Sequence, residues 1–87
     1  MVRVEIYTSG VCFYCVAAKN FLKLKGCDYS EIRIDREAGK LAEMLERSGG
    51  RRTVPQIFIN GAYVGGYDDL VAADRNGRLH DLMEKSP

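Results

Sequence analysis

The sequence predicts an α/β fold in one domain that covers residues 1–87. Three observations lead to this prediction: an alternating apolar run at the start, two segments with helical spacing of apolar residues, and an Asn-Gly pair between two short apolar runs. The expected element order is β-α-β-α-β-β-α, followed by a short C-terminal helix. A chain of 87 residues suits one small domain and leaves no room for two.

The first strand and the first helix follow from their spacing. Apolar residues alternate with polar ones over residues 2–7, which is the period of a strand with one buried face. Helical spacing then runs over residues 13–25. Ala17, Phe21 and Leu24 stand at i, i+4 and i+7, and we expect them to form the buried face of this helix.

A second strand and a second helix come next. Residues 29–34 alternate in the same way, and Asp35 is expected to cap the helix that follows. The apolar residues of that helix repeat at i, i+3, i+4 and i+7, and they are Ala38, Leu41, Ala42 and Leu45. A Ser-Gly-Gly run at residues 48–50 ends it. Strand, helix and strand in this order predict a parallel pair with a right-handed crossover.

The last part of the chain predicts a hairpin and two helices. Asn60-Gly61 is the strongest short hairpin signal, and it joins two strands within residues 56–64. Asp68 or its neighbour is expected to cap a third helix that runs to about residue 74. Apolar residues within 79–83 mark a short final helix.

Composition and charge exclude several classes of function. The formal net charge is +1, which provides no basic surface for nucleic acid or a membrane. No apolar run approaches the roughly 20 residues that span a bilayer, and no signal-peptide pattern precedes the first strand. We therefore expect a cytoplasmic location. Three cysteines, an odd number, argue against a purely structural disulfide framework.

The motif that carries chemistry is Cys-Phe-Tyr-Cys at residues 12–15, between the first strand and the first helix. A cysteine at a helix N-terminus lies near unsatisfied N–H groups and the positive end of the helix dipole, which favour the thiolate. The second cysteine, one turn on, can attack whatever the first has captured. A CxxC pair can also be half of a zinc site, but Cys27 and His80 stand alone and far apart. We therefore expect redox chemistry and no metal.

Three blocks of sequence follow one another in this short chain. They are Cys12-Phe13-Tyr14-Cys15, Thr53-Val54-Pro55 and Gly65-Gly66-Tyr67-Asp68-Asp69. Together they make the chain resemble the glutaredoxins, members of the thioredoxin-like fold, and the small bacterial dithiol glutaredoxins above all. The resemblance covers about residues 4–82. It implies a four-stranded mixed sheet flanked by helices, and a cis-proline at Pro55 that faces the active cysteine.

The resemblance implies a glutathione-dependent thiol–disulfide oxidoreductase. Cys12 is the expected nucleophile toward protein–glutathione mixed disulfides. In a second, dithiol route toward protein disulfides, Cys15 resolves the intermediate and glutathione reduces the resulting disulfide. Glutathione is thus expected as a co-substrate, and no tightly bound cofactor is expected.

The resemblance also implies which residues bind glutathione. The Val54 backbone is expected to hold its cysteine part, and the backbone at Tyr67 and Asp68 its γ-glutamyl carboxylate. Arg51 is expected at the glycine carboxylate and the Asp68 side chain at the ammonium. Tyr14 is expected to line the same groove. Each of these three residues also has a simpler alternative role: Arg51 as a solvated loop residue, Asp68 as a helix cap and Tyr14 as a core aromatic residue. The full expected set is Tyr14, Arg51, Thr53, Val54, Pro55, Gly66, Tyr67 and Asp68.

Two other functions fit the motif. Some members of the family bridge a [2Fe–2S] cluster between two subunits, each giving its first cysteine and a bound glutathione. A third possibility is a small redoxin that takes its electrons from thioredoxin reductase. The expected glutathione groove argues against this function. As partners we expect glutathione and glutathionylated or disulfide-containing proteins, with ribonucleotide reductase as a family-level example. We expect a monomer.

The chain departs from the family pattern at Phe13, where proline is common, and at Ser9, where many relatives have lysine. Phe13 restores an N–H at the start of the helix, from which we expect a changed redox potential. Ser9 removes a charge from the site of the glycine carboxylate, unless Arg51 or Lys19 replaces it. Cys27 is expected to be a small buried apolar residue.

Overall fold

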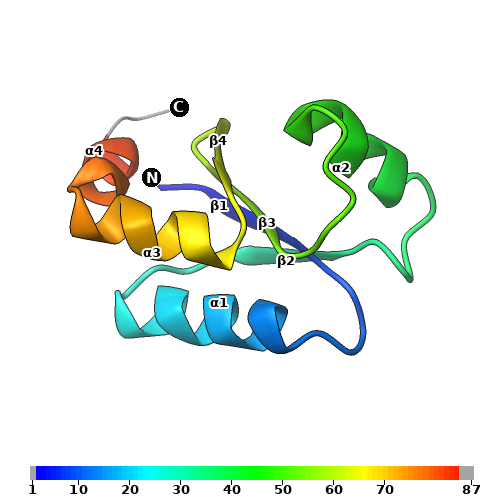
Figure 1. Ribbon diagram of the computed structural model, residues 1–87, viewed down its shortest axis with the longest axis horizontal. Helices are drawn as coiled ribbons and strands as arrows, with labels where there is room; N and C mark the ends of the chain where they lie inside the picture. The colour runs from blue at the N-terminus through cyan, green and yellow to red at the C-terminus, as the bar shows by residue number, and fades with distance from the viewer. Residues whose placement is uncertain (1, 85–87) are drawn as a thin grey trace.

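A computed structural model describes residues 2–84 of the chain. Its helices and strands follow the predicted order (Figure 1). They are β1 (Val4–Thr8), α1 (Phe13–Leu24), β2 (Ser30–Arg33), α2 (Lys40–Ser48), β3 (Gln56–Ile59), β4 (Ala62–Gly65), α3 (Tyr67–Arg75) and α4 (Arg78–Glu84). Within residues 2–84, no helix has the length and apolar character needed to cross a membrane.

The four strands form one mixed sheet in the order β2-β1-β3-β4. β1 runs parallel to β2 and antiparallel to β3, and β3 pairs with β4 as an antiparallel hairpin. Helices α1, α3 and α4 lie against one face of the sheet, and α2 lies against the other (Figure 1). The predicted α/β fold and its four-stranded mixed sheet are confirmed.

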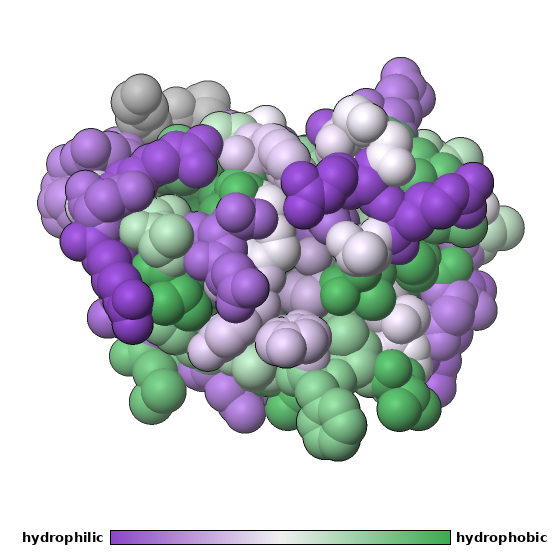
Figure 2. Space-filling view, in the orientation of Figure 1, coloured by the Kyte–Doolittle hydropathy of each residue, from purple (hydrophilic) through white to green (hydrophobic). Residues whose placement is uncertain are grey.

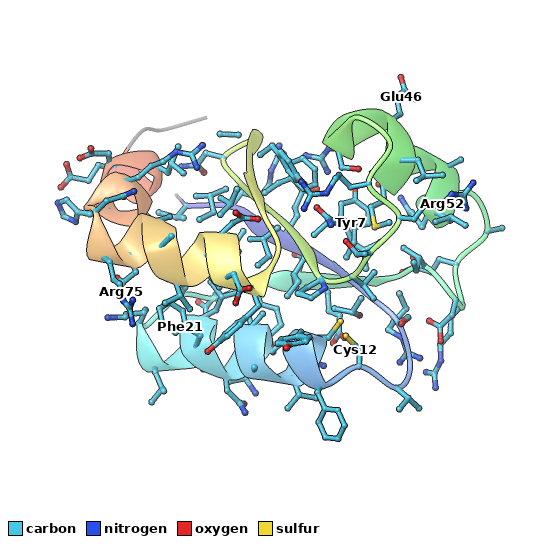
Figure 3. The ribbon with its side chains drawn as sticks, viewed as in Figure 1. Tyr7, Cys12, Phe21, Glu46, Arg52 and Arg75 are labelled. Atoms are coloured by element: carbon cyan, nitrogen blue, oxygen red, sulfur yellow. The ribbon has the colours of Figure 1, made fainter. Side chains whose placement is uncertain are left out.

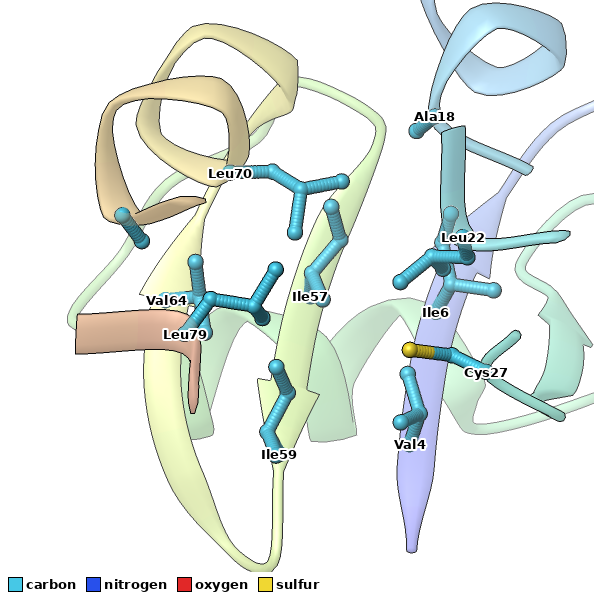
Figure 4. Close-up of a cluster of buried hydrophobic side chains, with 11 residues drawn as sticks. Val4, Ile6, Ala18, Leu22, Cys27, Ile57, Ile59, Val64, Leu70 and Leu79 are labelled. Atoms are coloured by element: carbon cyan, nitrogen blue, oxygen red, sulfur yellow. The ribbon is translucent and has the colours of Figure 1, made fainter. Parts of the chain in front are cut away.

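The face covered by α1, α3 and α4 holds the larger core, which is built from aliphatic side chains (Figure 4). Alternate residues of a strand point to the same face, so β1 and β3 each contribute two of them. The strands supply Val4, Ile6, Ile57 and Ile59, and the helices add Ala18, Leu22, Leu70, Ala73 and Leu79. None of these side chains is more than 3% exposed. This packing fixes where α1 and α3 begin relative to the sheet.

The face covered by α2 is smaller and is held by rings and charges. Its buried residues are Tyr7, Met44 and Phe58. The Arg47 guanidinium lies 4.0 Å from the centre of the Phe58 ring, where the ring quadrupole attracts it. It also donates to the Tyr7 hydroxyl at 2.7 Å and to the Glu5 carboxylate at 3.0 and 3.2 Å. One arginine therefore fastens α2 to two strands.

The first two strands are shorter than predicted. β1 begins at Val4 rather than at residue 2, and Arg3 contacts the hairpin turn. The Arg3 N–H donates to Asn60 Oδ1 at 2.8 Å, and the Arg3 carbonyl accepts the Asn60 N–H at 2.7 Å. At its other end β1 extends to Thr8, which stands opposite Arg33. β2 loses one residue at each end of the predicted range.

The buried face of α1 differs from the predicted one. The helix buries Cys15, Ala18 and Leu22, whereas Leu24 is 86% exposed. Phe21 lies at the border, only partly buried against the core. Both sets of residues have helical spacing, so periodicity alone cannot choose between them. The rotation of the helix against the sheet decides, and that is a tertiary property.

Helix α2 begins later than predicted, and Asp35 does not cap it. The helix starts at Lys40 after Gly39, whose φ of 80° is left-handed. The Asp35 carboxylate is bound instead by the Arg33 guanidinium, at 2.8 Å on each oxygen, and by the Gly10 N–H at 3.0 Å. A carboxylate held by these donors is not available to a helix N-terminus.

The late start of α2 also changes its buried face. Ala38 lies outside the helix, and Leu41 and Ala42 are exposed. Leu45 is half-buried, and Met44 fills the core against the sheet. The side of α2 that faces the sheet therefore carries Met44 and Ser48 in place of the predicted Leu41 and Ala42.

The predicted hairpin turn is confirmed, and the cap of α3 is corrected. Asn60 and Gly61 have φ of 51° and 84°, the two positive values that a tight two-residue hairpin turn needs. The cap residue of α3 is Gly66 instead of Asp68. The carboxylate of the neighbouring Asp69 accepts the Gly66 N–H at 3.0 Å, because an acidic residue three positions after the cap can reach back to it.

Candidate active site

Cys12 is the N-cap residue of α1, where the loop from β1 enters the helix (Figure 3). Its carbonyl accepts the Val16 N–H at 3.2 Å, and its Sγ accepts the Cys15 N–H at 3.1 Å. The N–H contact and the positive end of the helix both favour negative charge on this sulfur. The predicted position of the first cysteine at a helix start is confirmed.

Cys15 has a different environment, although it lies only one turn away. Its side chain is 2% exposed, whereas Cys12 is partly exposed. Burial, together with the hydrogen bond to Cys12, raises the pKa of Cys15 to about 12. At neutral pH Cys15 is therefore a protonated thiol beneath the surface. Only Cys12 of this pair can meet a large substrate directly.

The loop before β3 faces Cys12. The Cys12 Sγ lies 3.7 Å from the Val54 carbonyl oxygen, and the Val54–Pro55 bond is cis, as the family resemblance implies. The Gln56 side chain holds the loop from behind: its Nε2 donates to the Thr53 carbonyl at 2.9 Å and to the Thr53 Oγ1 at 3.1 Å. The backbone that faces Cys12 is thus fastened by a buried amide.

Tyr63 completes this support. Its hydroxyl donates to Gln56 Oε1 at 2.5 Å, and its ring packs against Phe58 with 5.1 Å between centroids. Gln56 is fully buried, and both ends of its amide are bonded. Since an unpaired buried amide is costly, the three side chains at 53, 56 and 63 specify one another's positions.

The start of α3 forms the third wall of the site. Tyr67 and Asp68 open this helix, so their N–H groups lie at its positive end. The Tyr67 ring lies 6.1 Å from the Tyr14 ring of α1 and edge-on to Phe21 at 6.5 Å. Asp68 is exposed and, unlike Asp69, is not used for capping. No residue in the described part of the chain binds its carboxylate, which can therefore meet a ligand.

These three walls enclose an open groove of about 270 Å³. The groove collects all eight residues that the sequence predicted for glutathione, together with Asp69, and the lining is Tyr14, Arg51, Thr53, Val54, Pro55, Gly66, Tyr67, Asp68 and Asp69. It carries a guanidinium as well as carboxylates, so it presents both signs of charge. It also presents strand-like backbone beside Pro55 and helix N–H groups at Tyr67. Such a lining suits an extended zwitterionic peptide.

The Asp35 carboxylate anchors the loop that leads from β1 to Cys12. Asp35 accepts the Gly10 N–H at 3.0 Å, and a β-carbon at Gly10 would lie 3.1 Å from both the Arg33 guanidinium and Asp35. The hydrogen bonds from Arg33 hold the pKa of Asp35 at about 2, so this anchor is charged at neutral pH. The turn after β2 therefore helps to position the active loop.

Sequence reasoning missed the residues that support the site, and two of them carried a usable signal. Gln56 is a polar residue at the head of an apolar strand, which calls for a buried partner. Asp69 stands three positions after Gly66, the spacing of a capping box. Asp35 carried a misleading signal, because its place suits a helix cap, whereas the Gly10 N–H that it binds lies 25 positions away. Tyr63 lies seven positions from Gln56 across the predicted hairpin, but nothing in the sequence indicates that its hydroxyl binds that amide.

The remaining candidates lie outside the groove. Cys27 is buried in the aliphatic core, with its Sγ 3.5 Å from Met83 Sδ, and burial raises the pKa of Cys27. It behaves as the small buried residue that the sequence predicted. His80 is exposed on α4 and lies 3.1 Å from Glu84. Neither residue contributes to the site.

Comparisons with known proteins agree with this geometry. The glutaredoxin family model matches residues 4–64. Glutaredoxin 3 of Escherichia coli K12 is 50% identical over 84 residues, which span 97% of this chain and 100% of that protein. The solution structure of glutaredoxin from Brucella melitensis is 48% identical with a TM-score of 0.81, and the match spans 97% of this chain and 90% of that one.

A further solved structure is the crystal structure of a buckwheat glutaredoxin–glutathione complex. It has a TM-score of 0.81 and 31% identity, and the match spans 92% of this chain and 74% of that one. The similarities extend over nearly the whole chain and include the thioredoxin-like sheet described above. The chain therefore belongs to the glutaredoxin family and is a thiol–disulfide oxidoreductase.

Proposed function

We propose that this chain reduces protein–glutathione mixed disulfides, with Cys12 as the nucleophile and glutathione as the source of electrons. One observation carries the proposal: the partly exposed Cys12 Sγ, at the start of α1, adjoins a groove whose lining offers charges of both signs and open backbone. The glutathione complex of the buckwheat relative supports the same ligand.

The chemistry needs two exchanges. The Cys12 thiolate attacks the glutathione sulfur of the mixed disulfide, a bond forms between Cys12 and glutathione, and the protein thiolate leaves and takes a proton from water. The thiolate of a second glutathione then attacks the same sulfur, which releases glutathione disulfide and restores Cys12. Each turnover therefore consumes one glutathione thiol, whose sulfur takes the place of the protein sulfur in a disulfide with the glutathione that the substrate carried.

The groove would hold glutathione by its charges and its backbone. Arg51 would pair with the glycine carboxylate, as a guanidinium is suited to bind a carboxylate. The N–H groups at Tyr67 and Asp68 would receive the γ-glutamyl carboxylate, and the Asp68 side chain would meet the ammonium. Val54 would pair with the peptide backbone of glutathione in the manner of an added strand.

Cys15 supports a second, dithiol route. In that route Cys12 attacks a protein disulfide, and Cys15 displaces the protein to form a Cys12–Cys15 disulfide, which two glutathiones reduce. Because burial raises the pKa of Cys15 to about 12, its proton must be removed before it can attack. We therefore propose that the single-cysteine route dominates with glutathionylated proteins. Protein disulfides, among them that of ribonucleotide reductase, would use the slower route.

The test is the glutathione-dependent release of thiol from a glutathionylated peptide. Wild type and Cys15→Ser should be active, and Cys12→Ser should lose all activity. Cys27→Ser is the matched control, since it removes a buried thiol outside the groove, and it should keep the wild-type rate. An inactive wild type, or an active Cys12→Ser variant, would overturn the proposal.

The cluster-bridging alternative stays a prediction. Within residues 2–84, no group of three or more His, Cys, Asp or Glu side chains could hold a metal ion. A [2Fe–2S] cluster at Cys12 would therefore need ligands from glutathione and from a second copy of the chain. The absorption spectrum and the mass in solution, after anaerobic purification with glutathione, would test it.

We also propose a monomer in the cytoplasm as the working form. Three free cysteines fit a reducing compartment such as the cytoplasm. A net charge of +1 offers no strongly charged surface through which two copies would attract each other. Light scattering on the reduced protein tests the monomer. A stable dimer in the absence of iron would contradict it.

A further inference from the structure

A second hollow adjoins Cys12 and shares no residue with the glutathione groove. It has a volume of about 240 Å³ and is lined by Gly10, Val11, Cys12, Phe13 and Val16, which we name the apolar rim. Phe13 and Val16 are three positions apart and share one side of α1. Tyr14 lines the groove instead and stands beside Tyr67 of α3. Cys12 therefore belongs to the apolar rim, and its Sγ also lies 3.7 Å from the Val54 carbonyl oxygen of the groove.

The apolar rim is exposed to an extent that the fold does not require. Val11 is 99% exposed, Phe13 90% and Val16 53%. Of the seven exposed large hydrophobic residues among those described, three belong to the apolar rim, and a fourth, Tyr14, follows Phe13 on the groove side. Hydrophobic side chains gather along the lower edge of the view, by the start of α1 (Figure 2). Apolar residues scattered singly need no explanation, but a cluster beside a reactive sulfur does.

None of the five residues of the apolar rim has a charged side chain, and the nearest ion pair, Arg33 with Asp35, lies at its Gly10 edge. Residues 6–18 contain no Asp, Glu, Lys or Arg. The groove on the other side of Cys12, by contrast, contains Arg51, Asp68 and Asp69. One sulfur is thus bordered by a surface that suits a zwitterion and by a surface that suits aliphatic or aromatic side chains.

We propose that the apolar rim binds an apolar side chain next to the substrate cysteine of a glutathionylated protein. This inference rests on the proposed function. Glutathione occupies the groove side of Cys12, so the protein half of the mixed disulfide approaches from the side that the groove leaves open. The protein sulfur is bonded to the glutathione sulfur that Cys12 attacks, so the neighbours of the substrate cysteine must come close to the residues around Cys12.

The expected consequence is a preference among protein substrates. An apolar neighbour of the substrate cysteine is taken out of water against Val11, Phe13 and Val16. A charged or amide side chain in the same place loses water without gaining a partner. Hydrophobic binding sites change kcat/KM by about tenfold or more between substrates that differ in one apolar group. The chain would therefore select substrates by the residue beside the cysteine.

The experiment uses three glutathionylated peptides that differ only in the residue after cysteine: Leu, Asn or Asp. We expect kcat/KM for the Leu peptide to exceed the values for both others by about tenfold, since Asn matches Leu in size and carries no charge. The double variant Val11→Ser/Val16→Ser should bring this ratio close to one. Leu24→Ser is the matched control, because it removes an exposed apolar side chain at the other end of α1, and its ratio should stay at the wild-type value.

Each outcome decides between the two proposals. If wild type reduces all three peptides equally, or if the ratio survives in the double variant, the apolar rim does not select substrates, although the proposed function stands. If Asn equals Leu and only Asp is slow, electrostatics discriminate and the inference is wrong. If wild type reduces no peptide, the proposed function fails as well.

Discussion

The two faces of the sheet are stabilised by different physics, and each supplies half of the site. The face under α1, α3 and α4 is packed with aliphatic side chains, and it sets the helix starts that carry Cys12 and Tyr67. The face under α2 relies on rings, a buried amide and Arg47. It holds the loop with Pro55 through Gln56.

The two faces are therefore expected to control different properties: the stability of the fold, and the geometry and pH response of the groove. Aliphatic burial does not depend on pH and is worth several kcal/mol for each large side chain. Hydrogen-bonded and charged contacts are individually smaller and depend on protonation. We therefore expect changes on the first face to unfold the protein, and changes on the second face to shift the groove and the response to pH.

The largest effect is expected for Leu22→Ala on the aliphatic face. Leu22 is fully buried, so the change leaves a cavity and should lower the free energy of unfolding by about 2–5 kcal/mol. Leu24→Ala, two residues on in the same helix, is the control and should change it by less than about 0.5 kcal/mol. Urea unfolding at pH 7 and at pH 5 measures both. A Leu22 deficit that depends on pH would break the comparison.

The next effect concerns the support of the loop. Gln56→Leu keeps the side chain volume but leaves the Tyr63 hydroxyl and the Thr53 carbonyl without their partner. We expect a loss of about 1–3 kcal/mol in the free energy of unfolding and an increase of about tenfold in the KM for glutathione. Tyr63→Phe removes one of these hydrogen bonds and should show a smaller change of the same kind. A lower stability with an unchanged KM would show that Gln56 does not position the groove.

Tyr7→Phe tests the charged contacts under α2. The Tyr7 hydroxyl donates to Glu43 at 2.5 Å and accepts from Arg47, and its removal should cost about 1 kcal/mol at pH 7. The hydrogen bond from Tyr7 lowers the pKa of Glu43. Its contribution is therefore complete above the ordinary pKa of a glutamate and is lost as the pH falls through the lower folded value.

The measurement for Tyr7→Phe is urea unfolding at pH 7, 5 and 3. The difference from wild type should shrink toward pH 3. Tyr29→Phe is the control, because Tyr29 packs against the aliphatic face and its substitution should show no such trend. A Tyr7→Phe deficit that stays constant over this range would contradict the assignment.

The smallest effect is expected for Asp35→Asn. The amide weakens the contacts with Arg33 and the Gly10 N–H, so the loop before Cys12 should open more often at pH 7. Because the pKa of Asp35 is about 2, below its ordinary 3.8, this stabilisation is present above 3.8 and disappears as the pH falls through about 2. Hydrogen exchange of the Gly10 amide by NMR measures the opening. Asp28→Asn is the control, and equal exchange in both variants would count against the anchor.

The features that local chemistry specifies could be predicted from the sequence. Cys12 at a helix start, Asn60-Gly61 as a hairpin turn and the order of the elements each depend on neighbours in the chain. The groove could be assembled because three short blocks matched a family pattern. The cis bond at Pro55 came from that resemblance and from no physical rule.

The features that the sequence did not predict depend on tertiary partners. Asp35 fits a helix cap by its type and place, yet Arg33 and Gly10 bind it more closely. Leu24 fits an apolar stripe, yet the rotation of α1 exposes it. In each case several local solutions were acceptable, and contacts between distant segments selected one of them.

The two adjacent glycines before α3 differ in how evolution can treat them. Gly65 has φ of 120°, and a β-carbon there would collide with the Asp69 carboxylate that caps α3. At Gly66 a β-carbon would meet the Pro55 carbonyl at an ordinary 3.5 Å. In a saturation library selected for folding, position 65 should therefore retain only glycine, whereas position 66 should admit alanine. Gly65 is required by the conformation of the backbone. Gly66 lines the groove, so ligand binding, and not folding, would decide which residue is kept there.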